Sequence, residues 1–236
     1  MLGGHWRIWK QQHNADHHMH TNIDGHDGDI ALGIIARIHP NQKRYWWHTY
    51  QHIYLPLFIY PISYFAWIYI LDFQKARRMK WGALDYLTLI FSKCIHISLF
   101  VVFPLFFRSL SEVVIGYAIV LAVTGTVTSF VFQLAHVVEI TEMVDATEEI
   151  THDEIHQLKT TANFATNNKF LSWYVGGLNF QREHHLYYKI SHVHYPEINL
   201  AVKKVCDALN LPQNEYPTLM SATKSHIRYL KVMGKQ

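Results

Sequence analysis

The stretch that decides the fold of this chain of 236 residues is His13-Asn14-Ala15-Asp16-His17-His18. A second histidine cluster of similar form lies far along the sequence. In a helix His13 and His17 share a face, since residues four apart are neighbours. In the second stretch, Gln181-Arg182-Glu183-His184-His185, the residues Gln181, His184 and His185 are three and four positions apart and also share one helix face. Neutral imidazole is a good ligand for iron, zinc or copper. Two such faces brought together predict a site for a pair of metal ions.

The composition favours a membrane protein with a polar part. Half of the residues are apolar, and only 17% are charged, against about 25% in soluble domains. The net charge of +3 is small and does not indicate nucleic acid as a partner. The two cysteines, Cys94 and Cys206, form neither a metal-ligand pattern nor a disulfide framework. The length suits one domain.

Three apolar segments separate the histidine clusters, at 48–71, 87–107 and 113–135. About 20 apolar residues span a bilayer as a helix, and 113–135 carries no formal charge. The segments predict an all-α, integral membrane protein. The alternative is a set of buried helices in a soluble protein.

The position of the clusters constrains the topology. If both clusters build one site, they lie on the same side of the membrane, and an even number of crossings separates them. The basic loop Lys75-Ala76-Arg77-Arg78-Met79-Lys80 predicts a cytosolic position. We therefore expect 48–71 to be re-entrant or interfacial, bent near Pro56 and Pro61. Segments 87–107 and 113–135 then form the transmembrane hairpin. Residues 1–47 and the cap 136–236 are cytosolic, and the histidine-rich cap holds the di-metal site.

A turn rich in Asp and Gly, Thr21 to Asp29, follows the first cluster. Its carboxylates at Asp24, Asp27 and Asp29 raise the question of calcium, but their spacing is not that of an EF-hand loop. A capping and turn role is the preferred interpretation.

The two clusters resemble the second and third histidine boxes of membrane fatty acid desaturases. The HxxxHH pattern beginning at His13 looks like the second box, and the QxxHH pattern beginning at Gln181 looks like the third. A third box headed by Gln resembles the front-end branch, which includes linoleoyl-CoA-type desaturases. The resemblance covers essentially the whole chain as a single desaturase domain, and it extends to the sequences TNIDG, QLAHV, TANFA, GGLN and HYP at residues 21–25, 133–137, 161–165, 176–179 and 194–196.

This resemblance implies a di-iron centre that uses O2 to insert a double bond into a fatty acyl chain. The iron ligands it implies are His13, His17, His18, His136, His184 and His185. For His136 the alternative is an interfacial histidine at a helix end. Gln181, Asp16 and Glu183 would support the ligands, although Asp16 and Glu183 also suit a solvated surface. The substrate would be a fatty acyl-CoA or an acyl lipid, and the electrons would come from cytochrome b5 or ferredoxin.

One feature of the family is missing from this sequence. Desaturases carry a first histidine box, HxxxH or HxxxxH, upstream of the second, whereas Met1-Leu2-Gly3-Gly4 resembles an internal stretch just before the second box. We therefore expect the chain to be truncated at its N-terminus and its di-iron site to be incomplete. The alternatives to a desaturase are a related di-iron hydroxylase and an inert truncated paralogue that binds lipid or a partner.

Overall fold

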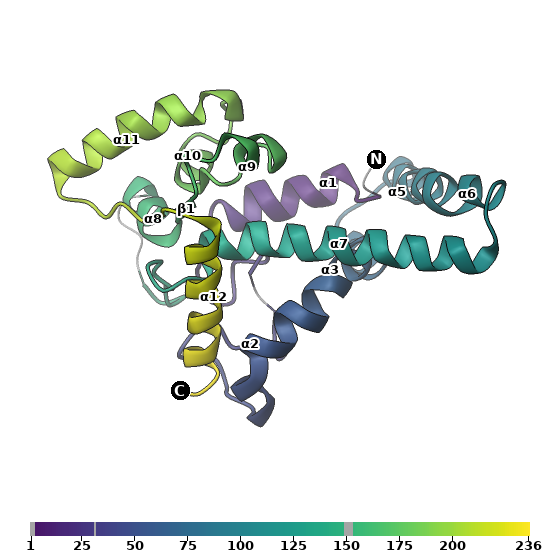
Figure 1. The fold of residues 1–236 in the computed structure, drawn as a ribbon, viewed down its shortest axis with the longest axis horizontal. Helices are drawn as coiled ribbons and strands as arrows, with labels where there is room; N and C mark the ends of the chain where they lie inside the picture. Colours follow the sequence, from purple (N-terminus) through teal and green to yellow (C-terminus); the bar gives the residue numbers. More distant parts are fainter. Residues whose placement is uncertain (1–2, 31, 149–152) are drawn as a thin grey trace. The chain divides into compact units, whose positions relative to one another are not determined.

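A computed structural model describes residues 3–30, 32–148 and 153–236 of the chain (Figure 1). The described residues are mostly helical, as predicted. The chain forms two compact units. The first unit consists of Met1–Ala15 and Tyr54–Ser129, and the second consists of Asp16–Ile53 and Phe130–Gln236.

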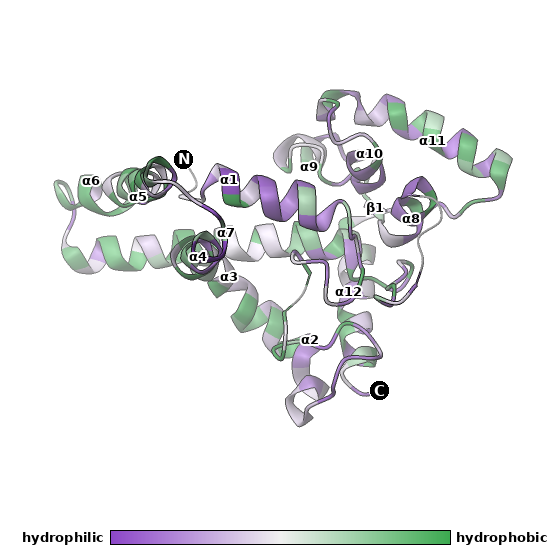
Figure 2. Cartoon of the chain, turned by 180° about the vertical axis from the view of Figure 1, so that it is seen from behind, coloured by the Kyte–Doolittle hydropathy of each residue, from purple (hydrophilic) through white to green (hydrophobic). Residues whose placement is uncertain are grey.

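Among the described residues, three helices are long and apolar enough to cross a membrane, judged by length and composition: Trp46–Arg78, Ala83–Leu105 and Leu110–His136. They contain most of the three predicted apolar segments. Figure 2 shows the apolar colour along the second and third of them. These helices indicate an integral membrane protein. The re-entrant or interfacial course of 48–71 stays a prediction.

Local irregularities subdivide the first two apolar helices. A 3-10 turn, Trp46–Tyr50, leads into α2 (Gln51–Tyr54), and π-helical turns at Leu55–Ile59 and Trp67–Leu71 separate α3 (Tyr60–Ala66) and α4 (Asp72–Arg78). The second apolar helix consists of α5 (Ala83–Ile97), a π-helical turn (Ser98–Val102) and α6 (Phe103–Leu105). The third apolar helix is α7 (Leu110–His136). The first of these π-helical turns contains Pro56. Proline has no N–H to donate to the preceding turn, which disturbs the helix there.

The first unit begins with α1 (Trp6–Trp9), which continues as the π-helical segment Lys10–His17. A buried ion pair between Asp72 of α4 and Lys93 of α5 lies at its start. The backbone N–H of His5 donates to the Asp72 carboxylate at 3.1 Å. The ion pair of Asp72 and Lys93 therefore connects two apolar helices to the start of α1.

Helix α7 packs closely on α3 within the first unit. A Cβ added at Gly125 would lie 2.5 Å from the carbonyl oxygen of Tyr60, so only glycine fits this contact. Next to it, the hydroxyls of Ser63 and Ser129 lie 2.9 Å apart. Small residues that let two backbones approach are typical of helix contacts in membranes.

The second unit contains the last turns of α7 and the elements that follow. These are α8 (Asp153–Thr160), β1 (Asn163–Phe164), α9 (Lys169–Tyr174), α10 (Gln181–Leu186), a 3-10 turn (His192–His194), α11 (Tyr195–Leu209), β2 (Glu215–Tyr216) and α12 (Leu219–Met233). Strands β1 and β2 are parallel, with Asn163 opposite Glu215.

Within the described part of the second unit, two apolar clusters connect its helices and strands. The first contains Leu134 of α7, Phe164 of β1 and Ala222 of α12, with Phe130 and Leu171 packed against it. The second cluster joins α8 to α11 through the contacts of Leu158, Val202 and Cys206. Burial of Leu134 in the first cluster ties the last turns of α7 to β1 and α12.

Candidate metal centre

The candidate centre lies in the second unit and begins at the C-terminal end of the segment Lys10–His17. His17 and His18 are buried there. The Nδ1–H of His17 donates to the two carboxylate oxygens of Asp27, at 2.8 and 2.9 Å. This interaction fixes the tautomer of the ring, so a metal ion would bind His17 through Nε2.

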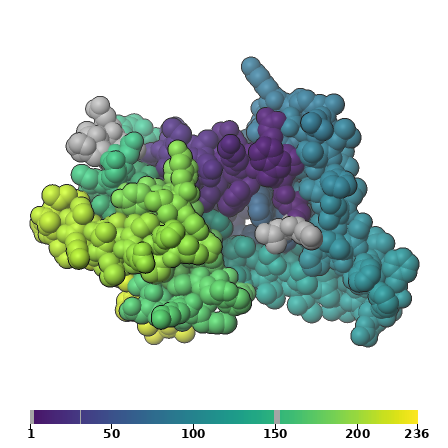
Figure 3. Space-filling model, turned by 90° about the horizontal axis from the view of Figure 1, so that it is seen from above, coloured from purple at the N-terminus to yellow at the C-terminus, as the bar shows by residue number. Residues whose placement is uncertain are grey.

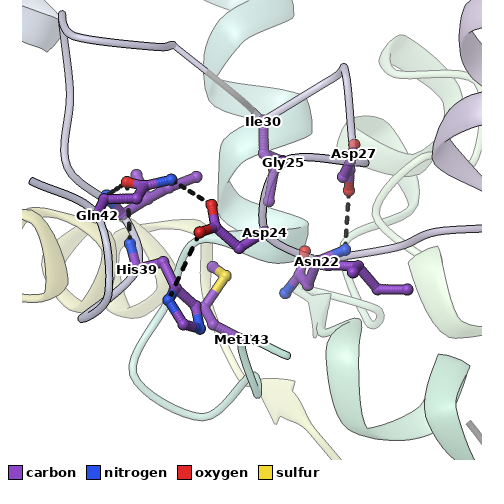
Figure 4. Close-up of a pocket in the computed structure, with 10 residues that line it drawn as sticks. Asn22, Asp24, Gly25, Asp27, Ile30, His39, Gln42 and Met143 are labelled. Carbon is purple, nitrogen blue, oxygen red and sulfur yellow. Dashed lines mark hydrogen bonds and ion pairs between the residues drawn. The ribbon is translucent and has the colours of Figure 1, made fainter. Parts of the chain in front are cut away.

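The loop that follows the histidines holds Asp27 in place. Its carboxylate also accepts the backbone N–H groups of Asn22, at 2.8 Å, and Asp29, at 2.9 Å. Figure 4 shows the bond between Asp27 and Asn22 in the lining of a small pocket, where Asp24 accepts from Gln42 instead. Asp27 thus has the turn role predicted for this loop and, in addition, orients a histidine.

Asn22 joins the same loop to the end of α7. Its φ of 58° lies in the left-handed region, where asparagine is among the few residues that are tolerated. Its side-chain amide nitrogen lies 2.9–3.0 Å from three carbonyl oxygens, those of His136, Glu142 and Thr160. One side chain therefore fixes the second histidine box against the residue that ends α7.

Helix α10 presents the histidines of the third box. The Nδ1–H of His185 donates to the Oε1 of Gln157, at 2.9 Å, and this Oε1 also accepts the hydroxyl of Thr21. The Nε2 of Gln157 donates to the carbonyl of His18 at 2.9 Å. The Nε2 of His185 is buried and has no hydrogen-bond partner among the residues that the structure describes. A buried nitrogen in this state is suited to a metal ion.

Three histidines from three elements meet at this point. His17, His136 and His185 each offer one ring nitrogen, and the three nitrogens lie within 4.8 Å of one another. Their ring centroids are 4.6–4.9 Å apart. His136 is fully buried, although the sequence left open a position at the interface. This cluster can hold a metal ion.

A second pair of histidines lies beside the cluster. The Nε2 atoms of His18 and His184 are 3.2 Å apart, which matches two nitrogens that bind one ion at about 2.1 Å. The ring of His18 stacks on that of His185, with centroids 4.3 Å apart. The hydroxyl of Tyr195 lies 3.3 Å from Nδ1 of His184, on the side away from His18.

The pKa values of His185 and His17 are shifted in opposite directions. Burial lowers the pKa of His185 well below its ordinary value, and the neighbouring histidines lower it further. Burial also lowers the pKa of His17, but the charge and hydrogen bond of Asp27 outweigh this, and the pKa is raised. His185 is therefore held neutral, which is the form that binds metal.

The remaining predicted residues take other positions. His13 belongs to the first unit, where its ring stacks on Trp9 with centroids 4.6 Å apart. The carbonyl of Asp16 accepts from His20, and the amide of Gln181 donates to the carbonyl of Leu178. The carboxylate of Glu183 accepts from the side-chain amides of Asn163, at 2.7 Å, and Asn199, at 3.0 Å. Whether any of them serves a metal stays a prediction.

The sequence interpretation missed the residues that hold the clustered histidines in place. Asp27, Gln157 and Thr21 contact the imidazoles directly. A signal existed for Asp27, because an acidic residue in the turn directly after a histidine box is placed to reach back. Gln157 gave no signal, because it lies in the polar segment between the boxes.

Comparison with known proteins identifies the family. The family model described as fatty acid desaturase matches residues 1–217. The chain belongs to the fatty acid desaturase family. The sequence of this desaturase-family chain is 36% identical to that of an sn-1 linoleoyl-lipid 6-desaturase of Arthrospira platensis, over 96% of the chain and 64% of the relative. A Synechocystis protein with the same name, sn-1 linoleoyl-lipid 6-desaturase, is also 36% identical, over 97% of the chain and 67% of the relative.

More distant relatives have related names. An acyl-lipid (8-3)-desaturase of Physcomitrium patens is 31% identical, over 99% of the chain and 52% of the relative. The chain spans between about half and two thirds of the length of these three proteins. No solved structure matches the chain. The resemblance to front-end desaturases, which the histidine boxes indicated, is confirmed.

Proposed function

We propose that this chain takes part in the O2-dependent desaturation of the acyl chain of a membrane lipid. The observation that carries the proposal is the buried cluster of His17, His136 and His185, with His18 and His184 beside it. The relatives support it, because they are named as desaturases of acyl lipids. They are longer than this chain, so their activity, substrates and partners belong to this proposal.

The metal we propose is a pair of iron ions. The cluster of His17, His136 and His185 would hold one ion, and His18 and His184 would contribute to the second. A ligand role of His13 stays a prediction from the resemblance. All of these donors are imidazole nitrogens, which suit iron. When bound, the iron pair supplies the activation of O2 that removal of hydrogen from an unactivated alkyl chain requires.

The side chains around the histidines have a positioning role in this proposal. Asp27 and Gln157 each receive an Nδ1–H, so they keep the opposite nitrogens of His17 and His185 directed at the ion. Partners of this kind commonly contribute 10–100-fold to metal affinity. Burial of the three clustered rings keeps bulk water away from the ion.

For the substrate we propose an acyl lipid rather than a fatty acyl-CoA, because the relatives are named for lipid-bound acyl chains. For the electron donor we propose cytochrome b5 or ferredoxin, since desaturation needs two external electrons. We also propose that both histidine boxes face the cytosol, on the same side as the basic loop at residues 75–80.

The first experiment is metal analysis of the detergent-purified chain loaded with Fe2+. We expect iron to bind, His185→Ala to lose at least the ion of the three-histidine cluster, and His194→Ala to bind as the parent does. His194 is a matched control because it is an exposed histidine outside the centre. Failure of the parent to bind iron would overturn the proposal for this chain.

The second experiment identifies the reaction. The iron-loaded chain in lipid vesicles receives an acyl lipid, O2 and reduced cytochrome b5 or ferredoxin, and the acyl chains are analysed by mass spectrometry. A product lighter by two hydrogens supports desaturation. A product heavier by one oxygen identifies a hydroxylase instead, and an iron-loaded chain without product overturns an autonomous activity.

A further inference from the structure

Three aromatic side chains are exposed on α9 in the second unit. Phe170, Trp173 and Tyr174 are 72%, 75% and 58% exposed. Their rings contact one another, with centroids 5.9 Å apart for Phe170 and Trp173 and 6.4 Å apart for Phe170 and Tyr174. We call these three residues the α9 patch. Clustered exposed aromatic rings usually mark an interaction site, and no role in the metal centre accounts for these.

The opposite side of α9 packs against the end of α7, and this contact gives the position of the α9 patch along that helix. Leu171 packs against the cluster of Leu134, Phe164 and Ala222, together with Phe130. Phe130 and Leu134 belong to the last turns of α7. Helix α9 therefore lies beside the C-terminal end of this transmembrane candidate, inside one compact unit.

The length of α7 relates that end to the bilayer. Residues 113–132 of the helix carry no charge, and about 20 residues of helix are about 30 Å long, which is the thickness of the hydrocarbon core. Gln133 and His136 then follow outside the core. The level of Phe130 and Leu134, where α9 packs, is therefore the membrane–water interface.

The chemistry of the patch fits that level. Tryptophan and tyrosine are enriched at membrane–water interfaces, where one end of the ring system is apolar and the other is wet. Lys169 precedes Phe170, and no acidic residue lies between 155 and 182. A positive charge beside the rings suits the phosphates of lipid headgroups. In Figure 3 the green part of the chain around residue 170 lies at the surface.

We infer that the α9 patch inserts into the headgroup region of the lipid bilayer and anchors the second unit on the membrane. The patch consists of side chains of α9 alone, and it uses none of the histidines of the centre. Its test therefore gives a result whether or not the chain binds iron or desaturates a lipid.

Spin labels measure the insertion directly. Labels are placed at F170C and W173C in a Cys94→Ser background, because Cys94 is exposed and Cys206 is buried. The matched control is K204C, at an exposed position on α11. The full chain is reconstituted in vesicles of phosphatidylcholine and phosphatidylglycerol. Collision rates are measured with O2, which concentrates in lipid, and with a nickel chelate, which stays in water.

We expect the O2 rate to exceed the nickel rate at residues 170 and 173, and the order to reverse at 204. A nickel rate at 173 equal to that at 204 would overturn the inference, because the patch would then face water. Low rates for both reagents at 173 would also overturn it, because a protein surface would then cover the patch.

A second measurement needs no label. Lipids brominated near the headgroup quench tryptophan fluorescence only within short range, and Trp173→Phe keeps an aromatic ring in place. We expect the parent to lose more of its fluorescence in brominated vesicles than W173F does. Equal fractional quenching of the two proteins, at equal helix content, would contradict insertion of this residue.

Discussion

Asp27 lies ten residues after His17 in the sequence and at 2.8 Å from it in the structure. The histidines themselves could be predicted, because spacings of three and four place side chains on one face of a helix. Asp27 could not be identified in the same way, because the path of a loop selects which acidic residue reaches back. Asp24 and Asp29 occupy the same turn, and only the folded loop distinguishes them.

The first prediction concerns this carboxylate. Asp27→Asn removes the charge that holds the Nδ1–H of His17, so we expect metal affinity to fall about 10–100-fold. The measurement is a competition titration of Co2+ against a chelator. Asp24→Asn is the matched control, because Asp24 lies in the same loop and accepts from Gln42 instead. Equal affinities for D27N and the parent would show that Asp27 serves only the turn.

At the scale of elements, hydropathy located the long helices well. The segment predicted over 113–135 is helix Leu110–His136. The pair β1–β2 was not predicted, because strands of two residues are too short to show an alternating pattern. Their register is decided by contacts from distant parts of the chain.

Helix α10 depends on such contacts. It has six residues, and isolated helices of this length are not stable. The Oδ1 of Asn163 accepts the backbone N–H of Arg182 at 3.0 Å, while its amide donates to Glu183. Asn199 of α11 donates to the other oxygen of the same carboxylate. The histidines of the third box are therefore presented by a helix that is held from outside.

A swap of donor and acceptor tests this arrangement. Asn163→Asp places two carboxylates against each other, and Glu183→Gln loses one of two buried hydrogen bonds. We expect each single variant to be destabilised by about 1–3 kcal/mol. In the double variant N163D/E183Q the amide of residue 183 donates to the carboxylate of residue 163, so this bond is restored with donor and acceptor exchanged. The bonds from Arg182 and Asn199 keep their direction, and most of the loss should be recovered. Thermal unfolding in detergent gives the comparison, and additive losses in the double variant would contradict it.

His226 of α12 makes the contact between α12 and α7 sensitive to pH. Its ring is fully buried, and its Nδ1–H donates to the carbonyl of Val137 at 2.7 Å. Burial lowers the pKa of His226 from 6.5 to about 4, although the bond to Val137 partly opposes this. The folded state therefore binds a proton less readily than the unfolded state does.

The sign of the pH dependence follows from linkage. The contribution of His226 to stability is complete above pH 6.5 and falls as the pH decreases towards about 4, by at most about 3 kcal/mol. His226→Asn keeps a donor for Val137 but does not titrate, so its unfolding temperature should fall less across this window. An identical fall in both proteins would assign the effect to other groups.

At the scale of the whole molecule, the same-side requirement for the histidine boxes and the basic loop at 75–80 make a topological prediction. Glycosylation tags should remain unmodified at residue 78 and become modified at residue 109, in the turn between α6 and α7. The measurement is a mobility shift after expression in microsomes. Modification at residue 78 would place the basic loop in the lumen and contradict the proposed topology.

Charge and hydropathy were enough for the topological prediction. They do not determine whether a membrane helix contributes a side chain to the metal centre. The transmembrane candidate α7 ends at His136, a member of the three-histidine cluster. The sequence left open an interfacial position for this histidine, because a helix end next to a bilayer suits both roles. The amide of Asn22, which holds the carbonyl of His136, accounts for the buried position.

The two ends of α7 have different mechanical freedom. Asn22, Ala162 and His226 bind the carbonyls of His136, Ala135 and Val137, so this end is anchored in the second unit. At the other end, Leu110 is exposed, and Ser109 and Glu112 bond mainly to each other. A bilayer that becomes thicker or thinner acts on a helix through hydrophobic mismatch. The bonds to the carbonyls of residues 135–137 oppose any such displacement of the backbone at His136, so we expect the three-histidine cluster to respond little to a change of bilayer thickness.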